Sequence, residues 1–457
     1  MNWRKFSGAG VAALLIFMAI MTLAPRAISQ DTYELLRRFG GGKTGAFPFG
    51  DLIFDQSGNL YGTTSSSAGD CGGYGGCGVV FELTPQDGGR WKESVLYTFQ
   101  YVDPAFAGFD PQAGLVFDQA GNLYGTTVQG GYWNFYCKYG CGTVFELTPG
   151  QDGTWTYSTL YTFGGGDDGR APQSGLIFDQ AGNLYGTTSG GGLNGGGVVF
   201  SLTPQLGGAW TENVLFNFGP WPGGGMGSTA GLVFDGAGNL YGTTQYGGTA
   251  SCGWMYGVPY PGCGTVFQLS PGPGGAWTGK VLYTFCSLAD CADGSYPVAG
   301  LVLDQAGNLY GTTRQGGDSY SCGGLGCGLV FSLTPSTGGS WTESVLYRFT
   351  GRSDGGNPYS GLTFSSAGDL YGTTILGGHG TGTVFKLVQS PGGGWQRKLV
   401  HAFAPGEVLG NNTYDPQGSF PYAGVIFDSA GNLYGMTTGN PDEYRNPDFG
   451  TVFEIIP

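Results

Sequence analysis

Charged residues are scarce in this sequence, and basic residues are the scarcest of them. Asp, Glu, Lys and Arg make up 11% of the 457 residues, and 18 basic side chains face 32 acidic ones, for a formal net charge of −14. Such a surface repels phosphate backbones, which argues against nucleic-acid binding. The two histidines are His379, which has no patterned Ser or Cys partner, and His401, which we interpret as structural. A catalytic triad is therefore poorly supported.

Long apolar segments are absent except near the start. The chain begins with Arg4 and Lys5, continues with an apolar stretch over residues 11–23, and then has small residues at Ala27 and Ser29. This order is typical of a signal peptide cleaved after Ser29. A membrane anchor is the alternative, but the stretch is short of the about 20 residues that a span needs. We expect residues 1–29 to be removed and residues 30–457 to form one domain, secreted to the extracellular space or the periplasm.

Ten cysteines occur in five close pairs. Together with a signal peptide, an even count of paired cysteines indicates disulfides in an oxidising compartment. Zinc binding is the alternative, but zinc sites reuse fixed short spacings and recruit histidine, whereas these separations vary. Each small ring contributes about 2 kcal/mol at most, so the bonds would pin individual loops. The expected pairs are Cys71 with Cys77, Cys137 with Cys141, Cys252 with Cys263, Cys286 with Cys291, and Cys322 with Cys327.

Glycine, in contrast, is abundant, with 94 residues, and much of it lies in a recurring motif. Residues 118–127 have the sequence D-Q-A-G-N-L-Y-G-T-T. Successive copies are 56 to 69 residues apart. A period of this size indicates an array of supersecondary units in one body. Close copies lie at residues 55–64, 179–188, 235–244 and 304–313, and looser copies at 365–374 and 428–437.

Each repeat contains four short apolar segments separated by turn residues. In the second repeat they span residues 114–118, 122–127, 142–147 and 155–163, which we name strands a, b, c and d. Their apolar residues occupy both faces, and no helical periodicity interrupts them. Four antiparallel strands per unit, packed sheet on sheet, predict an all-β protein with a β-propeller fold.

The number of strands also predicts how the ring closes. The seventh repeat ends in T-V-F-E-I-I-P, after strand c, and has no strand d of its own. Residues 34–39 resemble a strand d and precede the same Gly-Gly-Gly as in the second repeat. We therefore expect a monomeric, seven-bladed β-propeller of four-stranded antiparallel blades, in which the N-terminal strand completes the last blade and covers an open sheet edge. An open solenoid is the alternative, but it has no use for a split repeat.

The motifs G-L-x-x-D-x-x-G-N-L-Y-G-T-T and G-T-V-F-x-L, found at residues 114–127 and 142–147, resemble the tandem repeat of the Gloeo-Verruco (GloVer) family. The resemblance covers nearly the whole chain after the first 29 residues. It implies a secreted or surface-displayed bacterial protein of unassigned activity. The D-x-x-G-N-L-Y turn is also similar to that of other propeller repeats, whose functions differ, so the fold does not transfer an activity.

Propeller topology separates two faces of the ring. The a–b and c–d turns share one face and are short, whereas the b–c and d–a loops share the other face and hold all the length variation and all the cysteines. Variable loops on a rigid scaffold are where function usually lies. Their aromatic side chains suit stacking on sugars or peptides, although they could instead form the core of the loops. The candidate ligand-binding residues are Trp133, Tyr136, Trp221, Trp254 and Tyr256.

Several d–a loops carry a carboxylate shortly before strand a. Strand a is normally innermost, so these acids could surround the mouth of a central channel. A ring of acids would suit Ca²⁺ or a cationic ligand, because hard cations need several oxygen ligands. Ordinary Asp-Gly turns are the alternative. The candidate metal-binding residues are Asp110, Asp168, Asp293, Asp354 and Asp415.

Three classes of function remain open. The first is a secreted binding module for an extracellular glycan or surface polymer, acting through the b–c and d–a loops. The second is a structural or adhesive component of the cell envelope. The third is an extracellular glycoside hydrolase or lyase, because paired carboxylates cannot be recognised without their separation.

Overall fold

The computed structural model describes only part of the chain. The described residues are 31–67, 76–100, 108–219, 224–252, 254–255, 258–259, 262–317, 322–404, 407–409, 413–415, 418–440 and 448–457. The chain divides into two units, Met1–Gln30 and Asp31–Pro457, and all the described residues belong to the second. The expected signal peptide lies outside them. Within the described residues, none of the helices has the length and apolarity needed to span a membrane.

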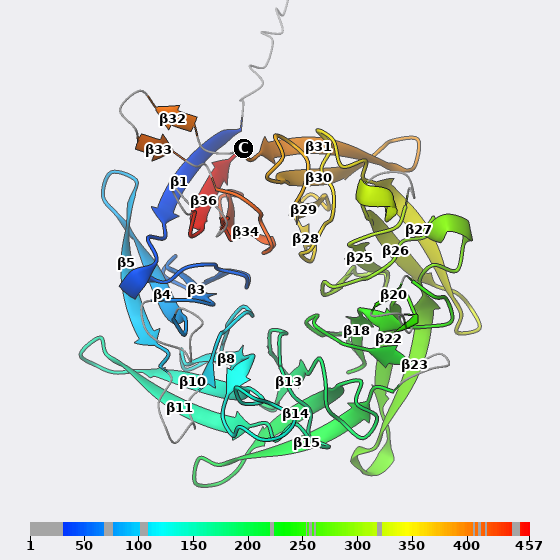
Figure 1. The fold of residues 1–457 in the computed structure, drawn as a ribbon, viewed down its shortest axis with the longest axis horizontal. Coiled ribbons are helices and arrows are strands. Elements are labelled where there is room, and N and C mark those ends of the chain that lie inside the picture. The colour runs from blue at the N-terminus through cyan, green and yellow to red at the C-terminus, as the bar shows by residue number, and fades with distance from the viewer. Residues whose placement is uncertain are drawn as a thin grey trace, which may run out of the picture. The chain divides into compact units, whose positions relative to one another are not determined.

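Seven four-stranded antiparallel sheets form a ring, as predicted (Figure 1). Each sheet is one blade. In the order a, b, c, d within each blade, the strands are β2 (Ile53–Phe54), β3 (Leu60–Thr64), β4 (Val79–Gln86), β5 (Arg90–Thr98); β7 (Val116–Phe117), β8 (Leu123–Thr127), β10 (Thr143–Pro149), β11 (Trp155–Thr162); β12 (Ile177–Phe178), β13 (Leu184–Thr187), β14 (Val198–Pro204), β15 (Trp210–Asn217); β17 (Val233–Phe234), β18 (Leu240–Thr244), β22 (Thr265–Pro271), β23 (Trp277–Thr284); β24 (Val302–Leu303), β25 (Leu309–Thr313), β26 (Leu329–Pro335), β27 (Trp341–Arg348); β28 (Thr363–Phe364), β29 (Leu370–Thr374), β30 (Thr383–Gln389), β31 (Trp395–Ala402); and β34 (Val425–Phe427), β35 (Leu433–Thr437), β36 (Thr451–Ile456), β1 (Thr32–Arg38).

Short two-stranded sheets and single-turn helices lie in the connections between these strands. The pairs are β6 (Gly108–Phe109) with β9 (Gln129–Gly130), β16 (Gly225–Met226) with β19 (Tyr246–Gly247), β20 (Trp254–Met255) with β21 (Val258–Pro259), and β32 (Glu407–Leu409) with β33 (Thr413–Asp415). The 3-10 helices are η1 (Gly42–Thr44), η2 (Pro273–Gly275), η3 (Ala289–Cys291) and η4 (Cys322–Gly324).

The N-terminal strand closes the ring, which confirms the prediction. β1 pairs antiparallel with β36 from Thr32 opposite Ile456 to Arg38 opposite Thr451, with one irregularity near Leu35. The first and last strands of the domain therefore lie side by side (Figure 1). Without β1, the backbone of β36 would be an unpaired sheet edge.

The recurring Asp explains the turn between strands a and b. In blade two, Asp118 Oδ1 accepts the backbone N–H groups of Ala120 and Asn122, at 2.9 and 2.8 Å. Asp118 Oδ2 accepts the Asn122 side-chain amide and the Tyr124 hydroxyl, at 2.8 and 3.1 Å. Gly121 has a φ of 87°, which favours glycine. The motif is thus a self-contained turn, and this face of the ring has a structural role.

The core lies between neighbouring blades. At each of the seven junctions, the phenylalanine that directly follows strand d packs edge-on against the strand c phenylalanine of the next blade, with ring centroids 5.0–5.3 Å apart. Glycine in strand b makes room for these rings, because a Cβ on Gly125 would lie 2.6 Å from the ring of Phe145. The seventh contact, between Phe39 and Phe81, joins the last blade to the first.

Threonine hydroxyls link the inner strands of adjacent blades. At six junctions, the first threonine of the G-T-T motif donates to a backbone carbonyl of the next blade, as Thr63 does to Ala113 at 2.9 Å. Met436 takes this position in blade seven. There, the backbone N–H of Gly424 donates to Asp51 Oδ1 at 2.6 Å. The junction between blades seven and one is therefore built differently from the others.

Strand a is shorter than the sequence predicted. In blade two it spans Val116–Phe117 instead of residues 114–118. Ala113 and Gly114 instead line a cavity on the ring axis, as do their counterparts in other blades. The strands a of all blades converge on the ring axis, so the residues before them line the cavity instead of extending the pairing with strand b.

Candidate functional site

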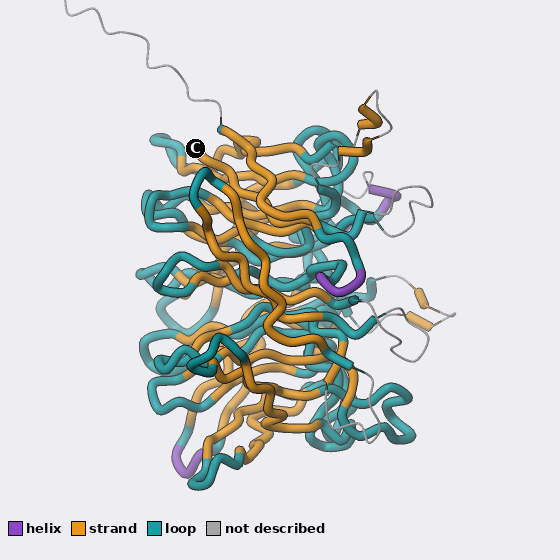
Figure 2. The backbone as a smooth tube through the Cα atoms, turned by 90° about the vertical axis from the view of Figure 1, so that its left-hand side faces the viewer, coloured by secondary structure: helices purple, strands orange, loops and turns teal. Residues whose placement is uncertain are grey.

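The b–c and d–a connections lie on one side of the ring, which we call the loop face. Figure 2 shows the strand pairs β20–β21 and β32–β33, which belong to a b–c and a d–a connection, projecting on the same side of the blades. The longest connections are therefore grouped as the sequence predicted. Two regions of this side stand out, namely one exposed aromatic loop and the entrance to the central cavity.

The b–c loop of blade two presents aromatic side chains to solvent. Trp133 is 70% exposed, Phe135 98% and Tyr136 62%, and Tyr132 is also exposed. The disulfide between Cys137 and Cys141 ties the loop. Rings this exposed do not form the core of a loop, so at Trp133 and Tyr136 the structure disagrees with the packing alternative.

Asn134 holds the same loop from within. Its side-chain amide donates to the carbonyl of Gly164 in the next connection, at 2.6 Å, and its Oδ1 accepts the N–H of Tyr136 at 2.8 Å.

The other three candidate ligand-binding residues have no described side chains. Trp221 and Tyr256 lie outside the described residues, and Trp254 is described only as part of the backbone of β20.

The predicted acids are held in separate turns. Asp293 accepts the hydroxyl of Tyr283 and the N–H of Ser287, both at 2.8 Å. Asp168 and Asp354 each accept a strand d tyrosine hydroxyl and a loop N–H in the same way. None of these three lines the central cavity, and no three carboxylates of the described residues lie close enough to share a metal ion. The turn interpretation accounts for all three.

The described residues show no such turn contacts for the two remaining candidate acids, Asp110 and Asp415. Asp110 has a φ of 61° and accepts the Gln112 amide at 3.1 Å, and its burial raises its pKa to about 6. Asp415 is described only as part of the backbone of β33.

Four of the five predicted disulfides are present. They join Cys137 with Cys141, Cys252 with Cys263, Cys286 with Cys291, and Cys322 with Cys327. Cys77 is also disulfide-bonded, and Cys71 lies outside the described residues. These bonds are consistent with an extracellular or periplasmic location. Two of these disulfides contact each other, which the sequence did not predict. The Sγ atoms of Cys252 and Cys291 lie 4.0 Å apart, so the b–c loop of blade four packs against the d–a loop that follows it.

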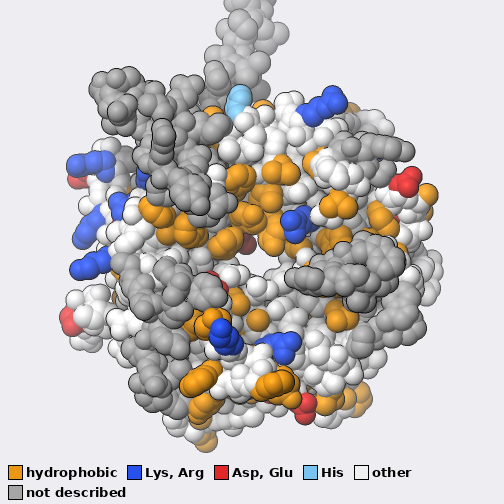
Figure 3. Space-filling model, viewed as in Figure 1, with side chains coloured by type: hydrophobic (Ala, Val, Ile, Leu, Met, Phe, Trp, Pro, Cys, Tyr) orange, Lys and Arg blue, Asp and Glu red, His pale blue; other side chains and the backbone are white. Residues whose placement is uncertain are grey.

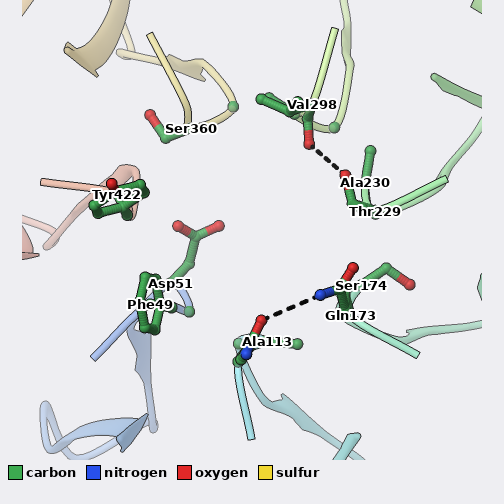
Figure 4. Close-up of a pocket in the computed structure, with 18 of the residues that line it drawn as sticks. Phe49, Asp51, Ala113, Gln173, Ser174, Thr229, Ala230, Val298, Ser360 and Tyr422 are labelled. Atoms are coloured by element: carbon green, nitrogen blue, oxygen red, sulfur yellow. Dashed lines mark hydrogen bonds between the residues drawn. The ribbon is translucent and has the colours of Figure 1, made fainter. Parts of the chain in front are cut away.

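A cavity of about 210 Å³ occupies the ring axis (Figure 4). All seven blades line it with the residues that precede strand a, and most of these are Gly, Ala, Ser, Gln or Thr. Among the described residues that line the cavity, Asp51 is the only charged one. Figure 4 shows its carboxylate directed into the open space between Tyr422, Ser360 and Ala113.

Asp51 is a departure from the repeat that sequence reasoning missed. Six repeats carry glycine where blade one carries Asp51, namely Gly114, Gly175, Gly231, Gly300, Gly361 and Gly424. The carboxylate is open to the cavity but surrounded by protein, and this desolvation raises its pKa, opposed in part by the hydrogen bond from Gly424. A comparison of the seven copies of G-L-x-x-D could have revealed it.

Aromatic rings form one side of the cavity wall. We call Phe49, Tyr359 and Tyr422 the aromatic rim. The ring of Tyr422 packs against Phe49 and Tyr359, with centroids 5.3 and 4.8 Å away, and the guanidinium of Arg314 lies 5.5 Å from the centre of the Tyr359 ring. A second hollow of about 410 Å³ shares Phe49 and Tyr422 and adds Phe47 and Phe420. Figure 3 shows hydrophobic side chains gathered around the hollowed centre of the ring.

Comparisons with known proteins give weak matches to solved structures and a clear match to one repeat family. No curated protein matches this chain. Among solved structures, a proposed oxidoreductase (glucose dehydrogenase) from Thermus thermophilus is 17% identical with a TM-score of 0.41, covering 75% of this chain and 95% of its own. A protein of unknown function from Dyadobacter fermentans is 13% identical with a TM-score of 0.39, covering 81% of this chain and 98% of its own. Similarity at this level carries no argument about activity.

The repeat itself gives a stronger match. The Gloeobacter/Verrucomicrobia repeat matches residues 71–261 and 252–457, which together are most of the chain. This agrees with the resemblance that the motifs indicated. The protein belongs to the Gloeobacter/Verrucomicrobia repeat family.

Proposed function

We propose that this propeller is a secreted binding module that recognises an extracellular glycan or surface polymer through its loop face. The observation that carries the proposal is the b–c loop of blade two, where Tyr132, Trp133, Phe135 and Tyr136 are all exposed. Aromatic faces beside polar groups stack on sugar rings. They also need no basic residues, which this chain largely lacks.

The restraints on the loop support the same proposal. The disulfide between Cys137 and Cys141 and the hydrogen bond from Asn134 to Gly164 limit the conformations that the loop can adopt when free. Less conformational entropy is then lost on binding. Several large rings exposed on one loop lower the solubility of a protein, and such exposed patches typically mark a site where a partner binds.

The test is retention of the protein on a panel of immobilised polysaccharides, followed by titration of the polymer that retains it. We expect Trp133→Ala to weaken binding by about 1–3 kcal/mol if its ring is central to the contact. The melting temperature should hardly change, because the side chain is mostly exposed. Trp254→Ala tests the loop of blade four in the same way.

Leu206→Ala is the matched control. Leu206 is a fully exposed apolar residue in a c–d turn, on the opposite face from Trp133. Its removal should change neither binding nor stability. If the two tryptophan variants lose stability while retention is unaffected, the structural or adhesive envelope role replaces the binding role. Chain cleavage in the retained polymer would instead favour the hydrolase or lyase.

A further inference from the structure

We propose that the central cavity is a second site, which binds a small methylated ammonium ion with Asp51 as its counter-ion and the aromatic rim against its methyl groups. This site is separate from the blade-two loop, and the proposal does not depend on glycan binding. It rests on the one charged side chain of the cavity, on its lack of a cationic partner, and on the rings beside it.

The repeat architecture does not require a carboxylate at position 51. Six other blades enter strand a through glycine and pack without a side chain there. One structural role is visible, since Asp51 Oδ1 accepts the N–H of Gly424 at 2.6 Å where Met436 has replaced the linking threonine. An asparagine would provide the same acceptor without charge. The negative charge itself therefore needs another explanation.

No basic side chain of the described residues forms a salt bridge with Asp51, although the guanidinium of Arg314 lies at the rim of the cavity beside Tyr359. The single salt bridge among the described residues joins Arg37 and Glu93, at the outer edge of the ring. The other lining residues in the described part of the chain are uncharged. The carboxylate is exposed to the cavity, but the protein around it desolvates the charge and raises the pKa of Asp51, opposed in part by the hydrogen bond from Gly424. A cation that entered the cavity would remove this cost, so the site favours positively charged ligands.

The cavity suits an organic cation better than a metal ion. Calcium needs six to eight oxygen ligands, whereas the cavity supplies one carboxylate. The carbonyl of Ala113 and its counterparts in five other blades already accept threonine hydroxyls. Tyr422 and Phe49 instead offer aromatic rings, and rings attract quaternary ammonium groups through their faces. Arg314 already makes such a contact with Tyr359 at the rim.

The size of the cavity limits the ligand. Its volume is about 210 Å³, many times the about 10–15 Å³ that one water molecule needs by the same measure. Choline is of this size, and an oligosaccharide is not. The hollow that shares Phe49 and Tyr422 continues the apolar surface beyond the cavity, so a longer substituent on the ammonium group could extend along it.

The test is calorimetric titration of the whole secreted protein with choline chloride at constant ionic strength. The matched neutral ligand is 3,3-dimethyl-1-butanol, which has the shape of choline without its charge. We expect choline to bind and the alcohol to bind at least about tenfold more weakly. This comparison uses the unaltered protein and does not depend on whether any variant folds.

Three variants locate the site. Asp51→Asn keeps the acceptor for Gly424 and should weaken choline binding about tenfold or more. Tyr422→Leu should weaken it by removing a ring. Asp87→Asn removes the same charge from an exposed turn between β4 and β5 on the opposite face, and should leave binding unchanged.

The proposal is overturned if the unaltered protein binds no choline, if the alcohol binds as well as choline, or if Asp51→Asn binds choline normally. A calcium site that Asp51→Asn abolishes, without choline binding, would overturn it in favour of a metal. Failure of these tests would leave the polysaccharide result unaffected, because that result depends on a different loop.

Discussion

Seven copies of one unit in a single chain allow each residue to be compared with six others in the same position. Most positions agree, so the residues that depart from the repeat are the informative ones. Asp51 in place of glycine and Met436 in place of threonine both lie at the junction between blades seven and one. Ser365 is another departure, and it lies in the a–b turn of blade six.

The turn of blade six has fewer hydrogen bonds than the other turns. The Ser365 hydroxyl accepts only the N–H of Asp369, at 3.1 Å. The aspartate at this position in blade two accepts two N–H groups, a side-chain amide and a tyrosine hydroxyl. Tyr371, the equivalent tyrosine of blade six, instead accepts a hydrogen bond from Lys386 at 3.3 Å.

We therefore predict that the double change Ser365→Asp with Asp369→Asn stabilises the protein. It would restore the pattern of the other blades, and the added hydrogen bonds in a partly exposed turn should contribute about 1 kcal/mol to the free energy of unfolding. Urea unfolding would measure this as a higher midpoint with an unchanged slope. Ser365→Asp alone is the control, because it places two carboxylates in one turn and should give no gain. Equal stabilisation by the single change would contradict this account.

Among the strands, β31 departs from the other outer strands at His401. Four of the other blades carry tyrosine at this position, and one carries phenylalanine. The imidazole stacks on the ring of Tyr33 in β1, with centroids 4.3 Å apart, and packs edge-on against Phe403 at 4.9 Å. This contact between β31 and the closing strand confirms the interpretation that His401 is structural. Burial, aided by the charge of His379, lowers the pKa of His401 to about 4.

This lowered pKa gives the β1–β31 contact a predictable response to acid. A histidine whose pKa is about 4 in the folded protein and about 6.5 in the unfolded chain stabilises the fold above pH 6.5, and that contribution is lost as the pH falls from 6.5 towards 4. His401→Tyr should remove this loss. Thermal melting at intervals between pH 7 and pH 4 should show a smaller decline in the variant than in the unaltered protein.

His379→Gln is the control for the acid response. His379 is exposed, so its removal should change the decline much less than His401→Tyr does. If both variants decline as steeply as the unaltered protein, other groups are responsible and His401 does not govern the acid stability of this contact.

The elements were predicted to different degrees, for physical reasons. Strands b, c and d were recognised because their apolar runs and flanking turns are local properties of the sequence. The length of strand a was wrong, since it depends on how closely the inner ends of all seven blades approach the axis. The exposure of Trp133 was left open, because the contacts of a loop depend on neighbouring loops that the local sequence does not specify.

At the scale of the whole molecule, counting strands predicted both the number of blades and the closure. The candidate site was predicted only in part. The presence of aromatic residues in the blade-two loop, on the loop face, follows from composition and topology, whereas Asp51, Phe49 and Tyr422 meet only when the ring is closed. Segments that are far apart in the sequence then converge on one cavity. No spacing between motifs contains that information.

Closure of the ring by β1 leads to the last prediction. β1 contributes the backbone pairing with β36 and the salt bridge from Arg37 to Glu93, and Phe39, which directly follows β1, packs its buried ring against Phe81 of blade one. Deleting residues 30–39 should remove all three and expose the edge of β36. We expect a clear fall in melting temperature, or aggregation, in the truncated domain compared with the domain of residues 30–457. A truncated domain that melts like the longer one would show that the ring holds without its closing strand.

Point changes in β1 separate the buried ring from the backbone pairing. Phe39→Ala keeps the strand but leaves a cavity at the only junction formed by the first and last blades, and should cost about 3–5 kcal/mol of unfolding free energy. Leu35→Ala is the matched control, because Leu35 lies in β1 four residues before Phe39 and is 38% exposed, so it should cost much less. If Phe39→Ala and Leu35→Ala have equal effects, the closure depends on backbone pairing alone. If only Phe39→Ala is destabilising, the seventh phenylalanine contact holds the ring closed as the other six hold its blades together.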